Sequence, residues 1–345
     1  MAFFRQELAI DLGTANTVIL KDGQVVLDEP SIIAIETKTG KLVAIGNEAQ
    51  LIEEHTNPRI YTVRPLMNGV IADYDAAELM LTSFIRRVLG RRSRRWNLFA
   101  PVLRIVIGIP GGGTPVDMRS IRDSATHAGA HDLYMIYEPM ASALGIGLDV
   151  MAPNGIMVVD IGGGTTEIAV ISLGGIVEPC SASIHIAGNE LTTNIIDYLG
   201  LQHNIVIGRT TAEQVKFAVG SVLTELPDDE APEDFKVIGR NIITAHPAEA
   251  MISYREVAQC MDKTISKIES EIIKVLQRTP PELYSNIVRN GIWLAGGGAM
   301  LRGLARRFSH RTNIEFHVAE DPLKAVARGT CLALKGAGRY PFLMR

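Results

Sequence analysis

Short aliphatic runs separated by polar turns occupy the beginning of the chain. Turn-forming residues such as Asp22, Gly23 and Gly40 interrupt the apolar pattern. Runs of β-branched and aliphatic residues bounded in this way are typical of β-strands. The pattern predicts four strands, at residues 8–11, 17–21, 24–27 and 31–35.

Longer stretches with apolar residues at helical spacing follow, and further buried strands lie between them. An acidic, proline-containing stretch at residues 227–235 is predicted to be a solvated loop. Strands and helices alternate through both halves of the chain, which indicates an α/β layered architecture. We expect strands at residues 103–110 and 291–295, a helix opening at Glu138-Pro139, and helices at residues 76–89, 116–130, 189–198, 211–223, 254–277 and 300–308.

The stretch VVDIGGGTTE at residues 158–167 carries the clearest chemical signal. It predicts a buried strand that ends at Asp160 and then turns through Gly162, Gly163 and Gly164. Successive free N–H groups in such a turn form an anion-binding nest suited to phosphate, and the carboxylate of Asp160 suits a hydrated Mg²⁺. Taken alone, the stretch is equally compatible with an ordinary glycine-rich hairpin turn.

A second copy of the same pattern, AIDLGTANT, lies at residues 9–17. From the Asp to the final Thr the spacing is six in both copies (17 − 11 and 166 − 160), and the copies lie 160 − 11 = 149 residues apart. Repetition over nearly half the chain predicts two related domains that each present one phosphate-binding turn to a nucleotide between them. Neither copy is a Walker A loop or a GxGxxG fingerprint.

Composition narrows the class of protein further. The 345 residues are 47% hydrophobic and 21% charged, and the net charge of −4 gives no reason to expect nucleic-acid binding. Cys180, Cys260 and Cys331 are widely spaced without a CxxC, which is typical of free thiols in a reducing compartment. No apolar run reaches the ~18 residues that span a bilayer, and the N-terminus lacks a secretion-signal pattern. A cytoplasmic protein is expected.

Nine stretches between residue 7 and about residue 335 resemble the MreB family of bacterial actin homologues. Hsp70 proteins and sugar kinases share only the phosphate turns, so the whole set is specific to this family. The stretches are AIDLGTANT (9–17), LDEPSIIAI (27–35), VRPLMNGVIADYD (63–75), EPMASALG (138–145), MVVDIGGGTTEIAVISLGGIV (157–177), the helix at 213–216, PPEL (280–283), LAGGGAMLRGL (294–304) and VAEDPLKAVARGT (318–330).

This resemblance implies an actin-like (ribonuclease H-like) duplicated α/β fold with two domains around an interdomain nucleotide cleft. Domain I is expected at residues 1–145, with a small subdomain at about 32–75, and domain II at residues 146–345, with a small subdomain at about 185–255. The implied function is a cytoskeletal protein that binds ATP and ADP with Mg²⁺ and hydrolyses ATP slowly as it polymerises. The implied filaments of many copies lie on the inner face of the cell membrane and maintain cell shape with cell-wall elongation membrane proteins.

The resemblance also assigns residues to the nucleotide site. Asp11 and Asp160 are expected near the metal, bound through water, and Glu138 and Thr165 are expected to orient the attacking water. The phosphates are expected at Gly13, Thr14, Ala15, Asn16 and Thr17 and at Gly162, Gly163, Gly164 and Thr165. The adenosine is expected at Glu213, Gln214, Val215 and Lys216 and at Gly296, Gly297, Gly298, Ala299 and Met300.

Several positions depart from the family pattern. Tyr137 stands where a Glu commonly precedes Glu138, and Gly111 stands in the usual Pro-Ser-Gly turn. At two positions near the cleft where the family usually has acidic residues, this chain has Asn189 and Thr192. Ala218 stands where the family usually has a Glu. These departures bear on the rate of hydrolysis more than on nucleotide binding.

A basic and aromatic segment at residues 86–99 predicts contact with the membrane. It places six arginines beside apolar side chains that suit the interface of an anionic bilayer. The alternative is a basic helix end whose aromatic side chains pack on the subdomain. The residues expected at the membrane are Arg94, Arg95, Trp96, Leu98 and Phe99.

Other function classes fit less well. A non-polymerising actin-like adaptor that binds ATP remains the nearest alternative, and sedimentation with ATP distinguishes it. An Hsp70-like ATPase would need a peptide-binding domain after the last family stretch. A sugar or acetate kinase would need a polar substrate pocket, for which the sequence offers no cluster.

Overall fold

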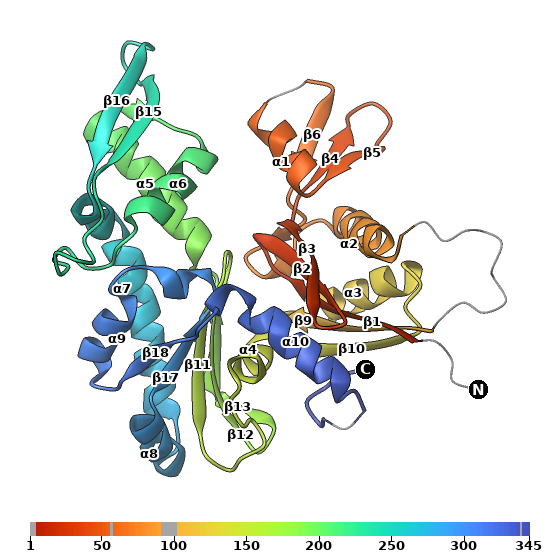
Figure 1. Ribbon diagram of the computed structural model, residues 1–345. Helices are drawn as coiled ribbons and strands as arrows, with labels where there is room; N and C mark the ends of the chain where they lie inside the picture. Colours follow the sequence, from red (N-terminus) through yellow and green to blue (C-terminus); the bar gives the residue numbers. More distant parts are fainter. Residues whose placement is uncertain (1–4, 56–57, 91–101, 339) are drawn as a thin grey trace.

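A computed structural model describes residues 5–55, 58–90, 102–338 and 340–345 of the chain (Figure 1). Strands and helices alternate along most of this length, as the apolar pattern predicts. Two five-stranded sheets form the centres of two lobes. We use "first lobe" for β1 to β10 (residues 5–137) and "second lobe" for β11 to η3 (residues 156–324).

The two large sheets share one topology. The first has the strand order β10-β9-β1-β2-β3 and the second the order β18-β17-β11-β12-β13, given from its other edge. In each sheet, the strand that comes first in the chain pairs antiparallel with the second of that sheet and parallel with the fourth. The strands are β1 (Arg5–Leu12), β2 (Asn16–Lys21), β3 (Gln24–Pro30), β9 (Val102–Ile109), β10 (Asp132–Tyr137), β11 (Ile156–Ile161), β12 (Thr166–Ser172), β13 (Gly175–Ile184), β17 (Ile292–Ala295) and β18 (Phe316–Val318).

Each lobe carries a smaller sheet at the upper end in Figure 1. In the first lobe, β4 (Ile33–Glu36), β5 (Leu42–Ile45) and β6 (Ile60–Val63) pack with α1 (Asn47–Glu54). A short hairpin, β7 (Leu66–Met67) and β8 (Val70–Ile71), leads back to the large sheet. In the second lobe the small sheet consists of β14 (Ile205–Val206), β15 (Phe235–Asn241) and β16 (Pro247–Ile252).

Side-chain caps start some of the helices, whereas those that begin at Glu138 and Arg209, for example, start without one. Thr114 and Asp117 form a capping box at the start of α3, and Ser253 and Glu256 form another at the start of α7. Within the described residues, none of the helices combines the length and apolar character that crossing a bilayer requires. The helices are α2 (Tyr74–Leu89), α3 (Pro115–His127), α4 (Glu138–Ile146), α5 (Gly188–His203), α6 (Arg209–Val219), α7 (Tyr254–Arg278), α8 (Pro281–Asn290), α9 (Leu304–Thr312) and α10 (Ala325–Lys335), with 3₁₀ turns η2 (Gly297–Met300) and η3 (Pro322–Lys324).

Helices α4 and α10 cross in close backbone contact between the lobes (Figure 1). A Cβ on Gly145 would lie 1.9 Å from the carbonyl oxygen of Ala325, and one on Gly329 would lie 1.7 Å from that of Ala141. No side chain larger than hydrogen fits at either glycine. Because α10 also packs on β1 and β9, the chain returns to its first lobe at the end.

The predicted elements differ from the observed ones mainly at their ends. Helix α6 stops at Val219 instead of residue 223, because Gly220 leaves the helical conformation and lies against the carbonyl oxygen of Lys216. The helix expected at residues 300–308 is α9, displaced towards the C-terminus because Gly303 has a φ of 79°. The β15–β16 hairpin and α8 have no counterpart among the predictions, and neither do α1, α10 or the strands β6, β10, β12, β13 and β18. The domain boundary at residue 145 stays a prediction.

Candidate nucleotide site

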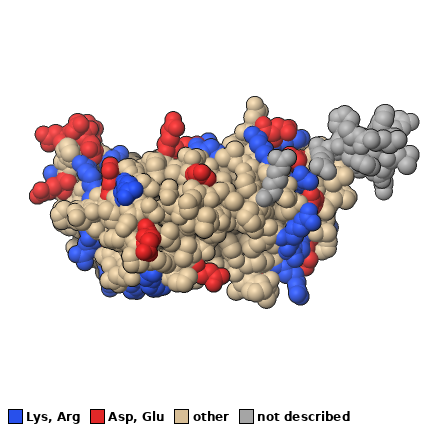
Figure 2. Space-filling model, turned by 90° about the horizontal axis from the view of Figure 1, so that it is seen from below, with Lys and Arg blue, Asp and Glu red and all other residues tan. Residues whose placement is uncertain are grey.

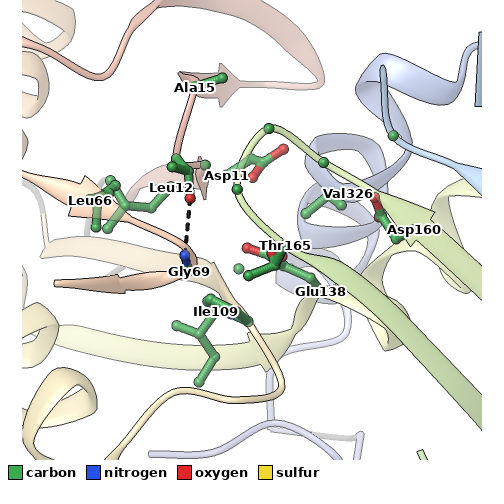
Figure 3. Close-up of a pocket in the computed structure, with 18 of the residues that line it drawn as sticks. Asp11, Leu12, Ala15, Leu66, Gly69, Ile109, Glu138, Asp160, Thr165 and Val326 are labelled. Carbon is green, nitrogen blue, oxygen red and sulfur yellow. Dashed lines mark hydrogen bonds between the residues drawn. The ribbon is translucent and has the colours of Figure 1, made fainter. Parts of the chain in front are cut away.

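A pocket opens between the two lobes at the ends of β1 and β11. Its lining includes residues of both glycine-containing turns and the start of α4. Figure 3 shows the side chains of Asp11, Glu138, Asp160 and Thr165 gathered around this space, with Leu66 and Ile109 on its first-lobe side. Asp11 and Glu138 keep part of their surface open to the pocket, whereas Asp160 is buried. The two copies of the sequence pattern therefore meet at one place.

The first turn follows β1 and is braced from behind by Ser31. The Ser31 hydroxyl donates to the carbonyl oxygen of Gly13 at 2.6 Å, and the Ser31 amide donates to that of Ala15 at 2.9 Å. Thr17 does not line the pocket; it is buried, and its hydroxyl lies 2.9 Å from that of Ser31. Gly13, Thr14, Ala15 and Asn16 line the pocket. Thr17 thus supports the turn from behind.

The second turn follows β11 and touches the first one. A Cβ on Gly163 would lie 2.7 Å from the Cβ of Ala15, and a Cβ on Gly164 would lie 2.8 Å from the side chain of Thr14. Gly162, Gly163, Gly164 and Thr165 all line the pocket. Because the glycines carry no side chain, two backbone turns can approach the same small volume from opposite lobes.

Buried and partly buried carboxyl groups surround this volume. Burial, together with the charges of Asp160 and Asp28, raises the pKa of Asp11 to about 7. Burial raises the pKa of Asp160 to about 6 against the lowering effect of its hydrogen bond from Ser142. Burial and three neighbouring carboxylates hold the pKa of Glu138 well above its usual range. The site therefore concentrates acidic groups whose charged forms are unfavourable without a cation.

Glu167 is a further carboxyl group at this site, and we did not predict it. It pairs in register with Asp160 across β11 and β12. Burial raises the pKa of Glu167 to about 7, and hydrogen bonds from Ser183 and the Gly111 amide act in the opposite direction. The described residues that line the pocket include no Lys or Arg, and the described chain contains no cluster of three or more metal-ligating His, Cys, Asp or Glu side chains.

Helix α6 lies beside the second turn but is held by contacts within the protein. The Lys216 ammonium group donates to the Gly188 carbonyl oxygen at 3.0 Å, to the Thr192 hydroxyl at 2.8 Å and to the Glu213 carboxylate at 2.9 Å. The Gly188 amide in turn donates to the carbonyl oxygen of Gly162 at 3.1 Å. Lys216 and Glu213 are therefore connected to the phosphate turn through the start of α5.

The other predicted adenosine residues divide between pocket, surface and core. Gly296 and Gly297 line the pocket. Gly296 has a φ of 76°, and a Cβ on it would lie 2.5 Å from the Oδ1 of Asp160. Gln214 and Met300 are exposed, whereas Val215, Gly298 and Ala299 are buried. An amide hydrogen bond from Val222 to Arg302 joins the segment after α6 to the segment after η2.

The departures from the family pattern have defined neighbours. Thr192 replaces an acidic residue, and its hydroxyl lies between Lys216 and Glu213. Asn189 accepts a hydrogen bond from Arg209. The predicted membrane residues Arg94, Arg95, Trp96, Leu98 and Phe99 lie outside the described residues.

Comparisons with known proteins agree with this geometry. The sequence model of the MreB/Mbl protein family matches residues 5–340. The chain is 42% identical over 337 residues to the cell shape-determining protein MreB of Escherichia coli K12, which covers 96% of this chain and 94% of the relative. It is 36% identical over 339 residues to the cell shape-determining protein Mbl of Bacillus subtilis, covering 98% of each chain.

Solved structures show the same fold. The crystal structure of MreB5 of Spiroplasma citri bound to ADP superposes with a TM-score of 0.87 at 35% identity, covering 96% of each chain. A structure titled "MamK double helical filament" superposes with a TM-score of 0.79 at 20% identity, covering 96% of this chain and 99% of that one. The fold is actin-like, as expected, and the chain belongs to the MreB/Mbl family.

Proposed function

We propose that this protein is an ATP-binding cytoskeletal protein whose membrane-associated filaments maintain cell shape. One observation carries the nucleotide part: two glycine-containing turns from opposite lobes meet over a group of buried carboxyl groups. The names of its relatives, cell shape-determining MreB and Mbl, support the cellular role. The MreB5 structures bound to ADP and to AMPPNP support nucleotide binding in this fold.

The turns are suited to hold phosphate groups from two sides. The backbone amides of Gly13, Thr14, Ala15 and Asn16, and of Gly162, Gly163, Gly164 and Thr165, are the donors that we assign to the phosphates, whereas Thr17 supports the first turn from behind. Asp11 and Asp160 would hold a hydrated Mg²⁺, because divalent cations favour carboxylate oxygens and would return both groups to the charged form. Bound Mg²⁺ neutralises negative charge on the phosphates during phosphoryl transfer.

Glu138 and Thr165 are the residues that we assign to the attacking water. Phosphoryl transfer to water needs positioning more than a strong base. The carboxyl group of Glu138 at the start of α4 and the hydroxyl of Thr165 after the second turn both face the pocket (Figure 3). A slow ATPase follows from such an arrangement. Replacing Glu138 with Ala should keep nucleotide binding and slow phosphate release; unchanged turnover would remove Glu138 from the mechanism.

The adenosine would lie between α6 and the turn at Gly296, Gly297 and Gly298. We assign Glu213, Gln214, Val215 and Lys216 to one wall, and Gly296, Gly297, Gly298, Ala299 and Met300 to the other. The hydrogen bond between Val222 and Arg302 supports this proposal because it ties the two walls together. Since Lys216 already donates to three protein acceptors, we assign it to shaping the wall more than to a direct ligand contact.

Association with further copies is supported by apolar side chains at opposite ends of the second lobe. At the upper end in Figure 1, Ile243 in the β15–β16 turn is 78% exposed. Leu201 on α5 is also 78% exposed. At the lower end, Leu173 in the β12–β13 turn is 67% exposed, with Met151 nearby. Figure 2 shows that the lower face is mostly uncharged. A head-to-tail arrangement of copies would cover these apolar side chains at both ends.

Sedimentation tests this assembly directly. We expect the purified protein with ATP and Mg²⁺ to form pelletable filaments, and we expect Leu173→Asp or Ile243→Asp to leave it in the supernatant. Asp introduced at exposed Leu332, on α10 away from both ends, is the matched control and should not change sedimentation. Nucleotide binding without filaments at any concentration would favour the actin-like adaptor instead.

We also propose that the filaments lie on the inner face of the cell membrane, with the cell-wall elongation membrane proteins as partners. The composition of the segment that contains Arg94, Arg95, Trp96, Leu98 and Phe99 supports membrane contact. Replacing Trp96 and Phe99 with Ser should abolish co-flotation with anionic liposomes while sparing filaments. Persistent flotation would point to another membrane contact.

A further inference from the structure

The two lobes meet along a second line besides the glycine turns. The turn after β9, from Pro110 to Gly113, extends from the first lobe to β12 and β13 of the second lobe. The contact centres on Glu167, a residue that neither metal binding nor the proposed placement of water uses. Glu167 is 2% exposed, so its carboxyl group depends on protein partners for its hydrogen bonds.

Both oxygen atoms of Glu167 have partners, and the partners come from different lobes. Its Oε2 accepts a hydrogen bond from the Gly111 amide of the first lobe at 3.2 Å. Its Oε1 accepts one from the Ser183 hydroxyl on the neighbouring strand at 2.7 Å. The carboxylate therefore bridges a backbone amide of one lobe and a side chain of the other.

The glycines of the turn make this approach possible. A Cβ on Gly111 would lie 2.8 Å from the Oε2 of Glu167, and a Cβ on Gly112 would lie 2.9 Å from the Ser183 hydroxyl. Gly111 is also the position at which the sequence departs from a Pro-Ser-Gly turn. The absence of a side chain leaves the amide of Gly111 free to approach the carboxylate closely.

The same contact reaches Thr165. Glu167 lies two positions beyond Thr165 in an extended segment, so both side chains leave the backbone on the same face. A Cβ on Gly69, in the β7–β8 turn, would lie 2.5 Å from the methyl carbon of Thr165 and 3.4 Å from the ring of Pro110. The Gly69 amide also donates to the Thr14 hydroxyl at 3.2 Å (Figure 3). Thr165 is therefore enclosed by first-lobe backbone that Glu167 helps to hold.

We propose that Glu167 is a positioning residue that ties the 110–113 turn of the first lobe to β12 and thereby sets the place of Thr165. The effect of Glu167 on ATP turnover rests on the proposed ATPase function. Closure of the lobes around a nucleotide brings the Gly111 amide to Glu167, and opening breaks that hydrogen bond. The occupied cleft and the arrangement for hydrolysis are thus coupled through one carboxyl group.

Amide hydrogen exchange and ATP turnover together test this role. In Glu167→Ala, the peptide containing Gly111 should exchange about tenfold faster with bound AMPPNP, and kcat should fall about tenfold, because one hydrogen bond of ordinary strength is lost. The Kd for nucleotide should change less than about threefold, since the phosphate turns are intact. Ser181→Ala is the matched control: it removes a hydroxyl of β13 that donates to Glu178 and should change neither quantity.

Two further variants separate position from charge and from misfolding. Glu167→Gln keeps an oxygen that can accept the hydrogen bond from the Gly111 amide. It should retain most of the protection of Gly111 from hydrogen exchange and most of the ATP turnover. Gly111→Ala disturbs the contact from the first lobe and should reproduce the Glu167→Ala result. Thermal unfolding of each variant shows whether it is folded.

Two results would contradict the proposed role of Glu167. Wild-type exchange at Gly111 and wild-type kcat in Glu167→Ala would overturn the proposal. Slow turnover in Glu167→Gln with full protection would also overturn it, because the charge and not the contact would then matter. A wild-type protein that binds AMPPNP without hydrolysing ATP would refute the proposed ATPase, while the exchange measurement alone would still decide whether Glu167 joins the lobes.

Discussion

Replacing Asp160 with Asn should stabilise the nucleotide-free protein at pH 8. Burial raises the pKa of Asp160 from 3.8 to about 6, a difference of 6 − 3.8 = 2.2. At about 1.4 kcal/mol for each pH unit, the buried charge costs at most about 3 kcal/mol of folding free energy at pH 8. Asn has nearly the same shape, carries no charge and retains an oxygen that can accept the hydrogen bond from the Ser142 hydroxyl.

The sign of the pH dependence follows from the direction of this shift. Between about pH 4 and about pH 6 the folded protein binds more protons at Asp160 than the unfolded chain does, because the pKa is higher in the folded state. The stability that the protonated group contributes is therefore complete below about pH 4 and is lost as the pH rises through about 6. The advantage of Asn should be about 3 kcal/mol at pH 8 and about half of that at pH 5.

Thermal unfolding in the presence of a chelator measures this difference. A gain of about 3 kcal/mol corresponds to roughly 3–6 °C in Tm for a chain of this length. Asp228→Asn in the exposed acidic loop is the matched control and should leave Tm unchanged at both pH values. A lower Tm for Asp160→Asn at pH 8, or an equal gain at both pH values, would refute the reasoning. The same variant should also lose the Mg²⁺ dependence of nucleotide binding.

Three other substitutions test the packing around the site. Gly163→Ala places a methyl group against Ala15 and should raise the Kd for nucleotide at least about tenfold in a calorimetric titration; an unchanged Kd would contradict the close approach of the turns. Gly329→Ala places a methyl group on the carbonyl of Ala141 and should cost about 3 kcal/mol of stability in thermal unfolding. Ser31→Ala removes the hydroxyl behind the first turn and should cost about 1 kcal/mol, with weaker nucleotide binding. Wild-type values in the last two would show that neither contact matters.

Sequence patterns predicted the centre of the site because its signals are local. Asp11 and Asp160 end apolar strands and precede small residues, so the strand, the turn and the carboxylate are all visible within ten residues. The matching topology of the two large sheets explains why the motif occurs twice. Residues whose role depends on a neighbour next to them in the chain are the ones that a pattern can identify.

Glu167 and Ser31 escaped prediction for the opposite reason. Glu167 acts through Gly111, which is 56 positions away, and Ser31 acts through Gly13, which is 18 positions away. Neither distance leaves a periodic signal. A polar residue inside an otherwise apolar strand was the available clue for Glu167, because buried carboxyl groups require partners. The β15–β16 hairpin was missed because its exposed apolar residues obscure the alternation expected of a strand.

The return of α10 to the first lobe has a consequence for synthesis of the chain on the ribosome. The second lobe is contiguous and can fold as soon as residues 156–324 have emerged. The first lobe lacks α10 and the pairing of Met344 with Met135 until residues 325–345 have also emerged. The lobe that is translated first is therefore the one that reaches its final packing last.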